Sequence, residues 1–125
     1  MAPLKIGFIG IGAFGSRAAM RLLWSGFHEL NIYDIHEQTP RIFTGMHGGL
    51  LLGSPAMVAQ LSDIVITALP SAAEMREVFF GWEGLAAEPK EDGLVMDIGV
   101  TDPLETVAMA KELGERGIQL VDAPA

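Results

Sequence analysis

Hydrophobic and polar residues follow two different periods in turn along the chain, and this alternation predicts strands and helices. Short apolar runs, several of them rich in β-branched residues, are typical of strands buried on both faces of a parallel sheet. We predict strands over residues 4–9, 31–34, 50–52, 63–69, 94–98 and 118–121. Between these runs, apolar residues recur at helical spacing. The predicted helices cover residues 13–23, 40–47, 55–61, 72–80 and 103–116.

Capping residues support the helix boundaries. A Ser or Asp before a helix can accept a hydrogen bond from a free N–H group of the first turn. Three predicted helices follow such a residue: Ser54, Ser71 and Asp102. Glu74 lies three residues after Ser71, which is the spacing of a capping box, where each side chain accepts from the other residue's N–H. The segment 81–92 is predicted to be a loop, and Trp24 is expected in the core or at its edge.

The order of strands and helices predicts the fold class. Strand and helix alternate from end to end, which is typical of right-handed βαβ units. We therefore predict an α/β fold of the Rossmann type, a doubly wound, mostly parallel sheet with helices on both faces. The 125 residues are enough for one domain, so residues 1–125 are assigned to a single unit. The sequence stops directly after a predicted strand, and we expect either an exposed sheet edge or a natural polypeptide that continues.

Composition and charge exclude several classes of protein. Hydrophobic residues make up 50% of the chain and charged residues 19%, which excludes intrinsic disorder. A formal net charge of −8 makes nucleic acid and anionic membranes unfavourable partners. The chain has no cysteine, and its three histidines share no ligand spacing, so no metal site is expected. The apolar runs are too short to span a bilayer and no signal peptide is recognisable, so we expect a soluble, cytoplasmic protein.

A glycine-rich loop lies between the first predicted strand and the first predicted helix. It consists of Gly10, Ile11, Gly12, Ala13, Phe14 and Gly15. In a dinucleotide-binding loop the first glycine permits a tight turn, the second lets a pyrophosphate approach the backbone, and the third lets the helix pack against the strand. The helix N-terminus then offers free N–H groups and partial positive charge to the phosphates. The alternative interpretation is a plain strand–helix turn.

An acidic residue ends the second predicted strand at the spacing expected for ribose binding. Asp34 follows Gly15 by 19 residues, and its carboxylate can accept hydrogen bonds from the ribose hydroxyls while repelling a 2′-phosphate. The nearest arginine is Arg41, so we predict NAD rather than NADP as the cofactor. Tyr33 is included in the candidate cofactor site. His36 is interpreted as a surface residue, and the alternative interpretation of Asp34 is a surface turn residue.

Four segments carry a family resemblance in the same order along the chain. They are Ile6–Gly15, Asp63–Pro70, Asp97–Pro103 and Gly117–Pro124. Together they resemble the β-hydroxyacid dehydrogenase family, which includes 3-hydroxyisobutyrate dehydrogenase and 6-phosphogluconate dehydrogenase. The resemblance covers almost the whole chain and implies a cofactor domain with a Rossmann fold.

The resemblance also implies further site residues. The strand tip formed by Ala68, Leu69 and Pro70 corresponds to a segment beside the cofactor in the family. Gly99 and Val100 stand where the family has a Ser-Thr pair near the nicotinamide ribose, and Val100 is kept as a candidate cofactor residue. The last residues resemble the start of the family's substrate motif and supply two candidates near the substrate: Ala123 and Pro124.

No catalytic residue is assigned within the chain. The family's general acid/base is a Lys on a helix in the later part of its members, and none of Lys5, Lys90 and Lys111 matches that position. The family's helical C-terminal substrate and dimerisation domain is also absent from these 125 residues. We therefore expect the chain alone to be inactive, and the complete enzyme to be a homo-oligomer that acts on a small molecule.

The combined prediction is the NAD-binding domain of an oxidoreductase. In the complete enzyme, hydride would pass between nicotinamide and a small hydroxyacid or semialdehyde, with the chemistry supplied by the cofactor. Two alternatives remain open. One is a free-standing dinucleotide-binding regulatory module without catalysis. The other is the cofactor domain of an imine-reductase-like enzyme, which the change to Gly99 and Val100 favours.

Overall fold

Strands and helices alternate along the computed structural model, which describes residues 4–26, 28–36, 38–88, 92–99 and 101–123. The strands are β1 (Leu4–Ile9), β2 (His28–Tyr33), β3 (Leu50–Leu51), β4 (Ile64–Thr67), β5 (Gly93–Asp97) and β6 (Ile118–Asp122). The helices are α1 (Ala13–Trp24), α2 (Gln38–His47), α3 (Pro55–Gln60), α4 (Ala72–Phe80) and α5 (Pro103–Gly114). Among the described residues, no helix has both the length and the apolar character needed to cross a membrane.

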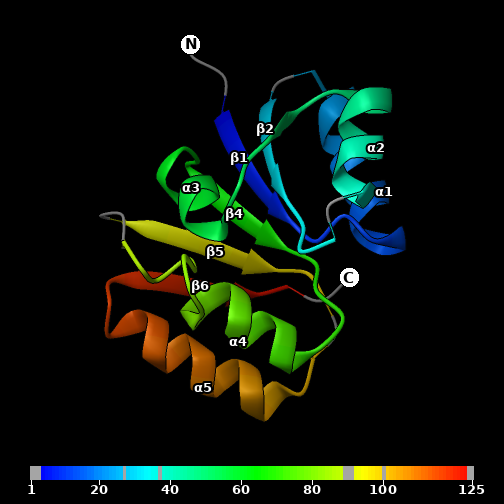
Figure 1. Ribbon diagram of the computed structural model, residues 1–125. Helices are drawn as coiled ribbons and strands as arrows, with labels where there is room; N and C mark the ends of the chain where they lie inside the picture. The colour runs from blue at the N-terminus through cyan, green and yellow to red at the C-terminus, as the bar shows by residue number, and fades with distance from the viewer. Residues whose placement is uncertain (1–3, 27, 37, 89–91, 100, 124–125) are drawn as a thin grey trace.

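The strands form one parallel sheet in the order β3-β2-β1-β4-β5-β6 (Figure 1). The chain first builds outward from β1 through β2 to β3, then crosses back to place β4 on the other side of β1. In such a sheet, ligands bind in the crevice at the carboxyl ends of the strands where the order reverses. That point lies between β1 and β4, and the predicted doubly wound Rossmann-type fold is confirmed.

Two apolar clusters bury the two faces of the sheet. One cluster packs side chains of α3, α4 and α5 against the strands, with Phe79, Met75 and Met109 fully buried. The other packs α1 and α2 against the opposite face around Phe8, and its helical members include Ala19. Figure 1 shows α1 and α2 on the other side of the sheet from α4 and α5. Helices cover both faces, as predicted.

The capping residues act as the sequence predicts. The Ser54 hydroxyl accepts a hydrogen bond from the Met57 N–H at 3.2 Å, which fixes the start of α3. The Asp102 carboxylate accepts from the Leu104 N–H at 2.9 Å and fixes the start of α5. Each cap pairs an N–H group that the helix itself leaves without a partner.

Some boundaries differ from the prediction for reasons outside the local sequence. β2 begins at His28 rather than at residue 31, because β1 offers a partner along its full length and pairs Leu4 with His28. The segment 81–92 contains turns, as predicted, but Leu85 and Ala86 are buried in the core and bond back to α4. The expectation for Trp24 is wrong, since its side chain is 69% exposed.

Candidate cofactor site

The turn that leaves β1 is closed by two glycines that no other residue could replace without strain. Gly10 has a φ of +102°, and its N–H donates to the Tyr33 carbonyl at 3.1 Å. A Cβ at Gly15 would overlap the carbonyl oxygen of Gly10. Gly15 therefore lets α1 start directly against the turn.

Gly12 differs from these two glycines because the space around it is open. Gly12 is the N-cap residue of α1 and lines the cavity, and a Cβ placed there would meet no atom within 4 Å. Within the part of the chain that the structure describes, no side chain caps this end of the 12-residue helix. The free N–H groups and the helix dipole therefore face open space in the cavity, an environment that favours an anion such as a pyrophosphate group.

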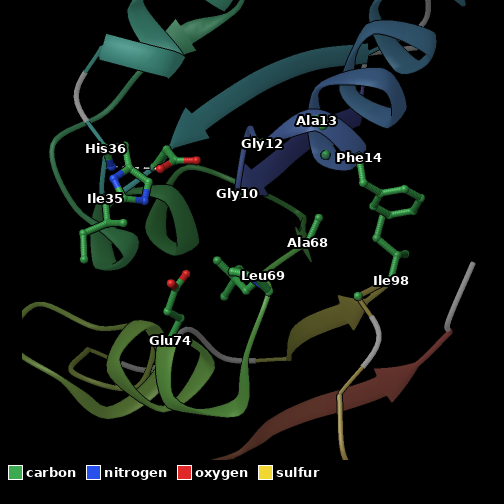
Figure 2. A pocket seen from close by; sticks show the side chains of 14 residues that line it. Gly10, Gly12, Ala13, Phe14, Ile35, His36, Ala68, Leu69, Glu74 and Ile98 are labelled. Atoms are coloured by element: carbon green, nitrogen blue, oxygen red, sulfur yellow. Dashed lines mark hydrogen bonds between the residues drawn. The ribbon is translucent and has the colours of Figure 1, made fainter.

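A cavity of about 530 Å³ opens at the carboxyl ends of the strands beside this helix (Figure 2). Its walls come from the segments that follow β1, β2, β4 and β5. The lining residues are Gly10, Gly12, Ala13, Phe14, Gly15, Asp34, Ile35, His36, Ala68, Leu69, Pro70, Glu74, Ile98 and Gly99. The set includes two carboxylates and no Lys or Arg, so the backbone of α1 is the principal positive feature available to an anion.

Most of the predicted cofactor residues meet in this cavity, and three described candidates lie elsewhere. The Ile11 side chain is buried, with 1% exposed, and its backbone N–H donates a hydrogen bond to Asp34, which lines the cavity. Tyr33 lines two smaller neighbouring cavities. Ala123 donates its N–H to the Asp97 carbonyl at 2.8 Å, beyond the end of β6. Val100 and Pro124 lie outside the described residues.

Five lining residues were not among the predicted site residues: Ile35, His36, Glu74, Ile98 and Gly99. Four of them directly follow the carboxyl end of a strand, which is a signal that could have found them. His36, which we interpreted as a surface residue, is exposed but borders the cavity beside Asp34. Glu74 belongs to α4, and only the tertiary arrangement brings it to the cavity.

Asp34 is held in place by two backbone donors. Its Oδ2 accepts from the Ile11 N–H at 2.7 Å, and its Oδ1 accepts from the His36 N–H at 2.8 Å. These bonds tie the end of β2 to the glycine loop. Each carboxylate oxygen keeps acceptor capacity for a further donor, so Asp34 is fixed at the cavity wall and still able to accept from ribose hydroxyls.

Tyr33 lies next to Asp34 in an acidic neighbourhood. Burial raises the pKa of its phenol, and the carboxylates of Asp34, Glu77 and Glu83 raise it further. The hydroxyl is therefore protonated at neutral pH and available as a donor in the neighbouring cavity.

Asp97, the last residue of β5, carries a buried carboxyl group and directly precedes two residues that line the cavity. It is fully buried, and its Oδ1 accepts from the Thr67 hydroxyl at 2.9 Å and from the Gly99 N–H at 3.2 Å. Its Oδ2 has no hydrogen-bond partner among the described residues. Burial raises the pKa of this carboxyl, the Thr67 and Gly99 bonds lower it, and Asp122 on β6 raises it.

We expect the Asp97→Asn variant to lose part of the pH dependence of stability. A folded-state pKa above the unfolded value means that the folded chain binds more protons, so stability falls as pH rises above about 4, the ordinary Asp pKa. Asn keeps an acceptor for Thr67 and cannot ionise. Urea unfolding at several pH values from about 4 to 7 should show a smaller decline in the variant, with the exposed Glu29→Gln as control. Equal declines in wild type and Asp97→Asn would contradict the burial of this charge.

Gly99, at the position where the resemblance implies a Ser, allows two segments beside the cavity to approach each other closely. A Cβ at Gly99 would stand 2.9 Å from the Leu69 carbonyl oxygen and 3.4 Å from Asp97 Oδ1. The segment after β5 thus approaches the segment after β4 more closely than a side chain would allow. In this chain, glycine permits the two segments that border the cavity to meet.

The sequence also matches a described protein family over nearly its full length. Residues 5–125 match the NAD binding domain of 6-phosphogluconate dehydrogenase. The chain belongs to this family. It is an NAD(P)-binding domain of the β-hydroxyacid dehydrogenase type, and the predicted resemblance is confirmed.

Two curated relatives are oxidoreductases. The chain is 32% identical over 119 residues to 3-sulfolactaldehyde reductase of Escherichia coli, covering 95% of this chain and 39% of the relative. It is 34% identical over 119 residues to mitochondrial 3-hydroxyisobutyrate dehydrogenase of Homo sapiens, covering 95% and 35%. The chain therefore spans less than half the length of the relatives it matches.

Solved structures share the fold at lower identity. A Mycobacterium tuberculosis 3-hydroxyisobutyrate dehydrogenase with L-serine superimposes with a TM-score of 0.86 at 22% identity, covering 98% of this chain and 40% of that one. A variant of an imine reductase from Myxococcus stipitatus in complex with NAD⁺ gives a TM-score of 0.80 at 19% identity, covering 98% and 40%. Both likenesses concern the fold.

Among the described residues, no group of three or more His, Asp or Glu side chains is placed to hold a metal ion.

Proposed function

We propose that the cavity beside α1 binds NAD and that the chain is the cofactor domain of a dehydrogenase acting on a small hydroxyacid or semialdehyde. The observation that carries the proposal is the open space at Gly12, where an uncapped helix N-terminus faces the cavity. The oxidoreductase relatives support the reaction class. We also propose that the complete enzyme is a homo-oligomer, as the family resemblance implies, and that it is cytoplasmic.

The chain's own residues would bind and orient the cofactor. The N–H groups at the start of α1 would hold the pyrophosphate, and Asp34 would accept from the adenosine ribose. Ala68 and Ile98 lie on the side of the cavity away from His36 and would border the nicotinamide end (Figure 2). When bound, the nicotinamide ring supplies hydride transfer.

The general acid/base for the substrate would come from the complete protein. Among the described residues, Lys5 and Lys111 are exposed, and neither lines the cavity. We propose that these 125 residues bind the cofactor without turning over substrate, and that a helical C-terminal domain supplies the catalytic Lys. A hydride-transfer assay with 3-hydroxyisobutyrate and NAD⁺ should therefore show no activity from this chain.

Asp34 is expected to select NAD over NADP. In the Asp34→Asn variant we expect NAD⁺ binding to weaken about tenfold to a hundredfold, because a hydrogen bond to a charged group contributes about 1.5–3 kcal/mol. The preference over NADP⁺ should fall as well, because the charge that repels a 2′-phosphate is removed. Isothermal titration calorimetry with both cofactors would measure the two dissociation constants.

The matched control is Glu29→Gln, which removes one charge from the opposite end of the same strand. It should leave both affinities unchanged. Unchanged NAD⁺ binding in Asp34→Asn would show that the ribose does not lie at Asp34.

The cofactor domain of an imine-reductase-like enzyme is the second candidate. It is favoured by Gly99, which removes the family's hydroxyl from the cavity wall, and by the shared fold. The two candidates have the same cofactor site and differ in the substrate. Assays of the complete enzyme with a hydroxyacid and with a cyclic imine would separate them.

A further inference from the structure

A second carboxylate enters the cavity from α4. Figure 2 shows the Glu74 side chain pointing from this helix into the cavity, on the side bordered by Ile35. Glu74 is half-buried and also lines the neighbouring cavity of about 350 Å³ that contains Tyr33 and Trp82. It is thus a charged group that borders two cavities.

Helix capping does not account for the position of this carboxylate. The sequence predicts a capping box, yet only half of it forms: the Ser71 hydroxyl accepts from the Glu74 N–H at 3.2 Å. Among the described residues, the Glu74 side chain has no hydrogen-bond or ion-pair partner. Arg76 on the same helix is paired instead with Glu105 and Glu112 of α5. A carboxylate without a partner therefore faces the cavity.

The location of Glu74 relative to the proposed cofactor indicates which group it meets. With the pyrophosphate at Gly12 and the ribose at Asp34, the base would extend past Asp34 along the part of the cavity that Ile35 and Leu69 line. Ile35 is 56% exposed, so it presents apolar surface on which a planar ring can pack. Glu74 lies in the same wall, where its oxygens can only accept hydrogen bonds.

We propose that Glu74 recognises the adenine base of the dinucleotide by accepting a hydrogen bond from its exocyclic amino group. This inference rests on the proposed NAD-binding function and adds a base-selecting residue to it. The amino group is a donor that matches an ionised carboxylate. A base with hydrogen in place of that group would offer Glu74 no donor, so the complex would lose a hydrogen bond to a charged group.

The experiment compares two cofactors on the same protein. Dissociation constants are measured by calorimetry for NAD⁺ and for nicotinamide purine dinucleotide, the analogue in which hydrogen replaces the amino group. Wild type should bind NAD⁺ at least tenfold more tightly than the analogue. Glu74→Ala should bind the two equally. Glu74→Gln keeps an acceptor without the charge and should retain a preference of about threefold.

The control is Glu77→Gln, one helical turn later, which lines the smaller cavity and not the main one. It should keep the wild-type preference. NAD⁺ binding by wild type with no preference over the analogue would overturn the role of Glu74 and leave the proposed function intact. No detectable NAD⁺ binding by wild type would overturn both. Circular dichroism of each variant separates a lost preference from a lost fold, and Glu74→Gln provides the test if Glu74→Ala unfolds.

Discussion

Replacing Gly12 with alanine is expected to weaken NAD⁺ binding at least tenfold while changing the free energy of unfolding by no more than about 1 kcal/mol. Gly12 has a φ of −73°, which any residue adopts, and an added Cβ would meet no atom within 4 Å. The free protein therefore tolerates alanine, apart from the small cost of a poorer N-cap. The added methyl group would occupy the space through which the pyrophosphate approaches the N–H groups of α1.

The comparison for Gly12→Ala is Gly45→Ala. Gly45 lies in α2, its surroundings are equally open, and it does not line the cavity. Alanine there should leave NAD⁺ binding unchanged and stabilise the helix by about 0.5–1 kcal/mol. Calorimetric titration and urea unfolding of the two variants give both quantities. If Gly12→Ala binds NAD⁺ as tightly as wild type does, the pyrophosphate does not lie at the start of α1.

The glycine loop and Asp34 could be predicted because short-range sequence spacing determines them. The turn needs Gly10 at its tight point and Gly15 at its close approach, and both needs are met within a few residues. Asp34 follows the next strand, and its place beside the loop is fixed by the parallel pairing of β1 with β2. The parallel sheet with helices on both faces could likewise be expected from the alternation of strands and helices.

The far wall of the cavity could not be predicted in the same way. Glu74, Ile98 and Gly99 reach the cavity because β4 lies next to β1, and β5 next to β4, in the finished sheet. The local sequence around Glu74 indicates a capping box, and that role would account for the residue. In the structure, however, the Ser71 hydroxyl accepts from the Glu74 N–H while the Glu74 carboxylate makes no hydrogen bond among the described residues. Local patterns predict local roles, whereas a second role depends on which distant elements come together.

The packing of the irregular segments also depends on tertiary contacts that the local sequence does not indicate. Residues 81–92 have the composition of a loop, yet the N–H groups of Leu85 and Ala86 donate to the Val78 and Phe79 carbonyls at 2.8 and 2.9 Å. This return over the end of α4 buries two apolar side chains in the core. Trp24 shows the converse, because it falls at the last residue of α1, where the helix extends beyond its packed face.

Gly15→Ala is expected to have the opposite profile to Gly12→Ala, with a loss of stability of about 3 kcal/mol, near the upper end of the cost of overpacking. A Cβ at Gly15 would overlap the carbonyl oxygen of Gly10 and stand 3.3 Å from the Ala68 Cβ. The overlapped atom belongs to the backbone of a turn whose N–H is already bonded to Tyr33, so it has little freedom to move. Either α1 shifts away from the sheet or the turn distorts, and both break the close packing of helix on strand.

Urea unfolding followed by circular dichroism measures this cost, with Gly12→Ala as the matched variant in the same loop. For a domain whose total stability is about 5–15 kcal/mol, a loss of 3 kcal/mol moves the midpoint clearly. NAD⁺ binding should be lost together with stability, because the N–H groups of α1 lose their alignment. A Gly15→Ala variant as stable as wild type would mean that the turn between β1 and α1 is looser than its contacts indicate. That result would contradict the assignment of a packing role to Gly15 and a cofactor-binding role to Gly12.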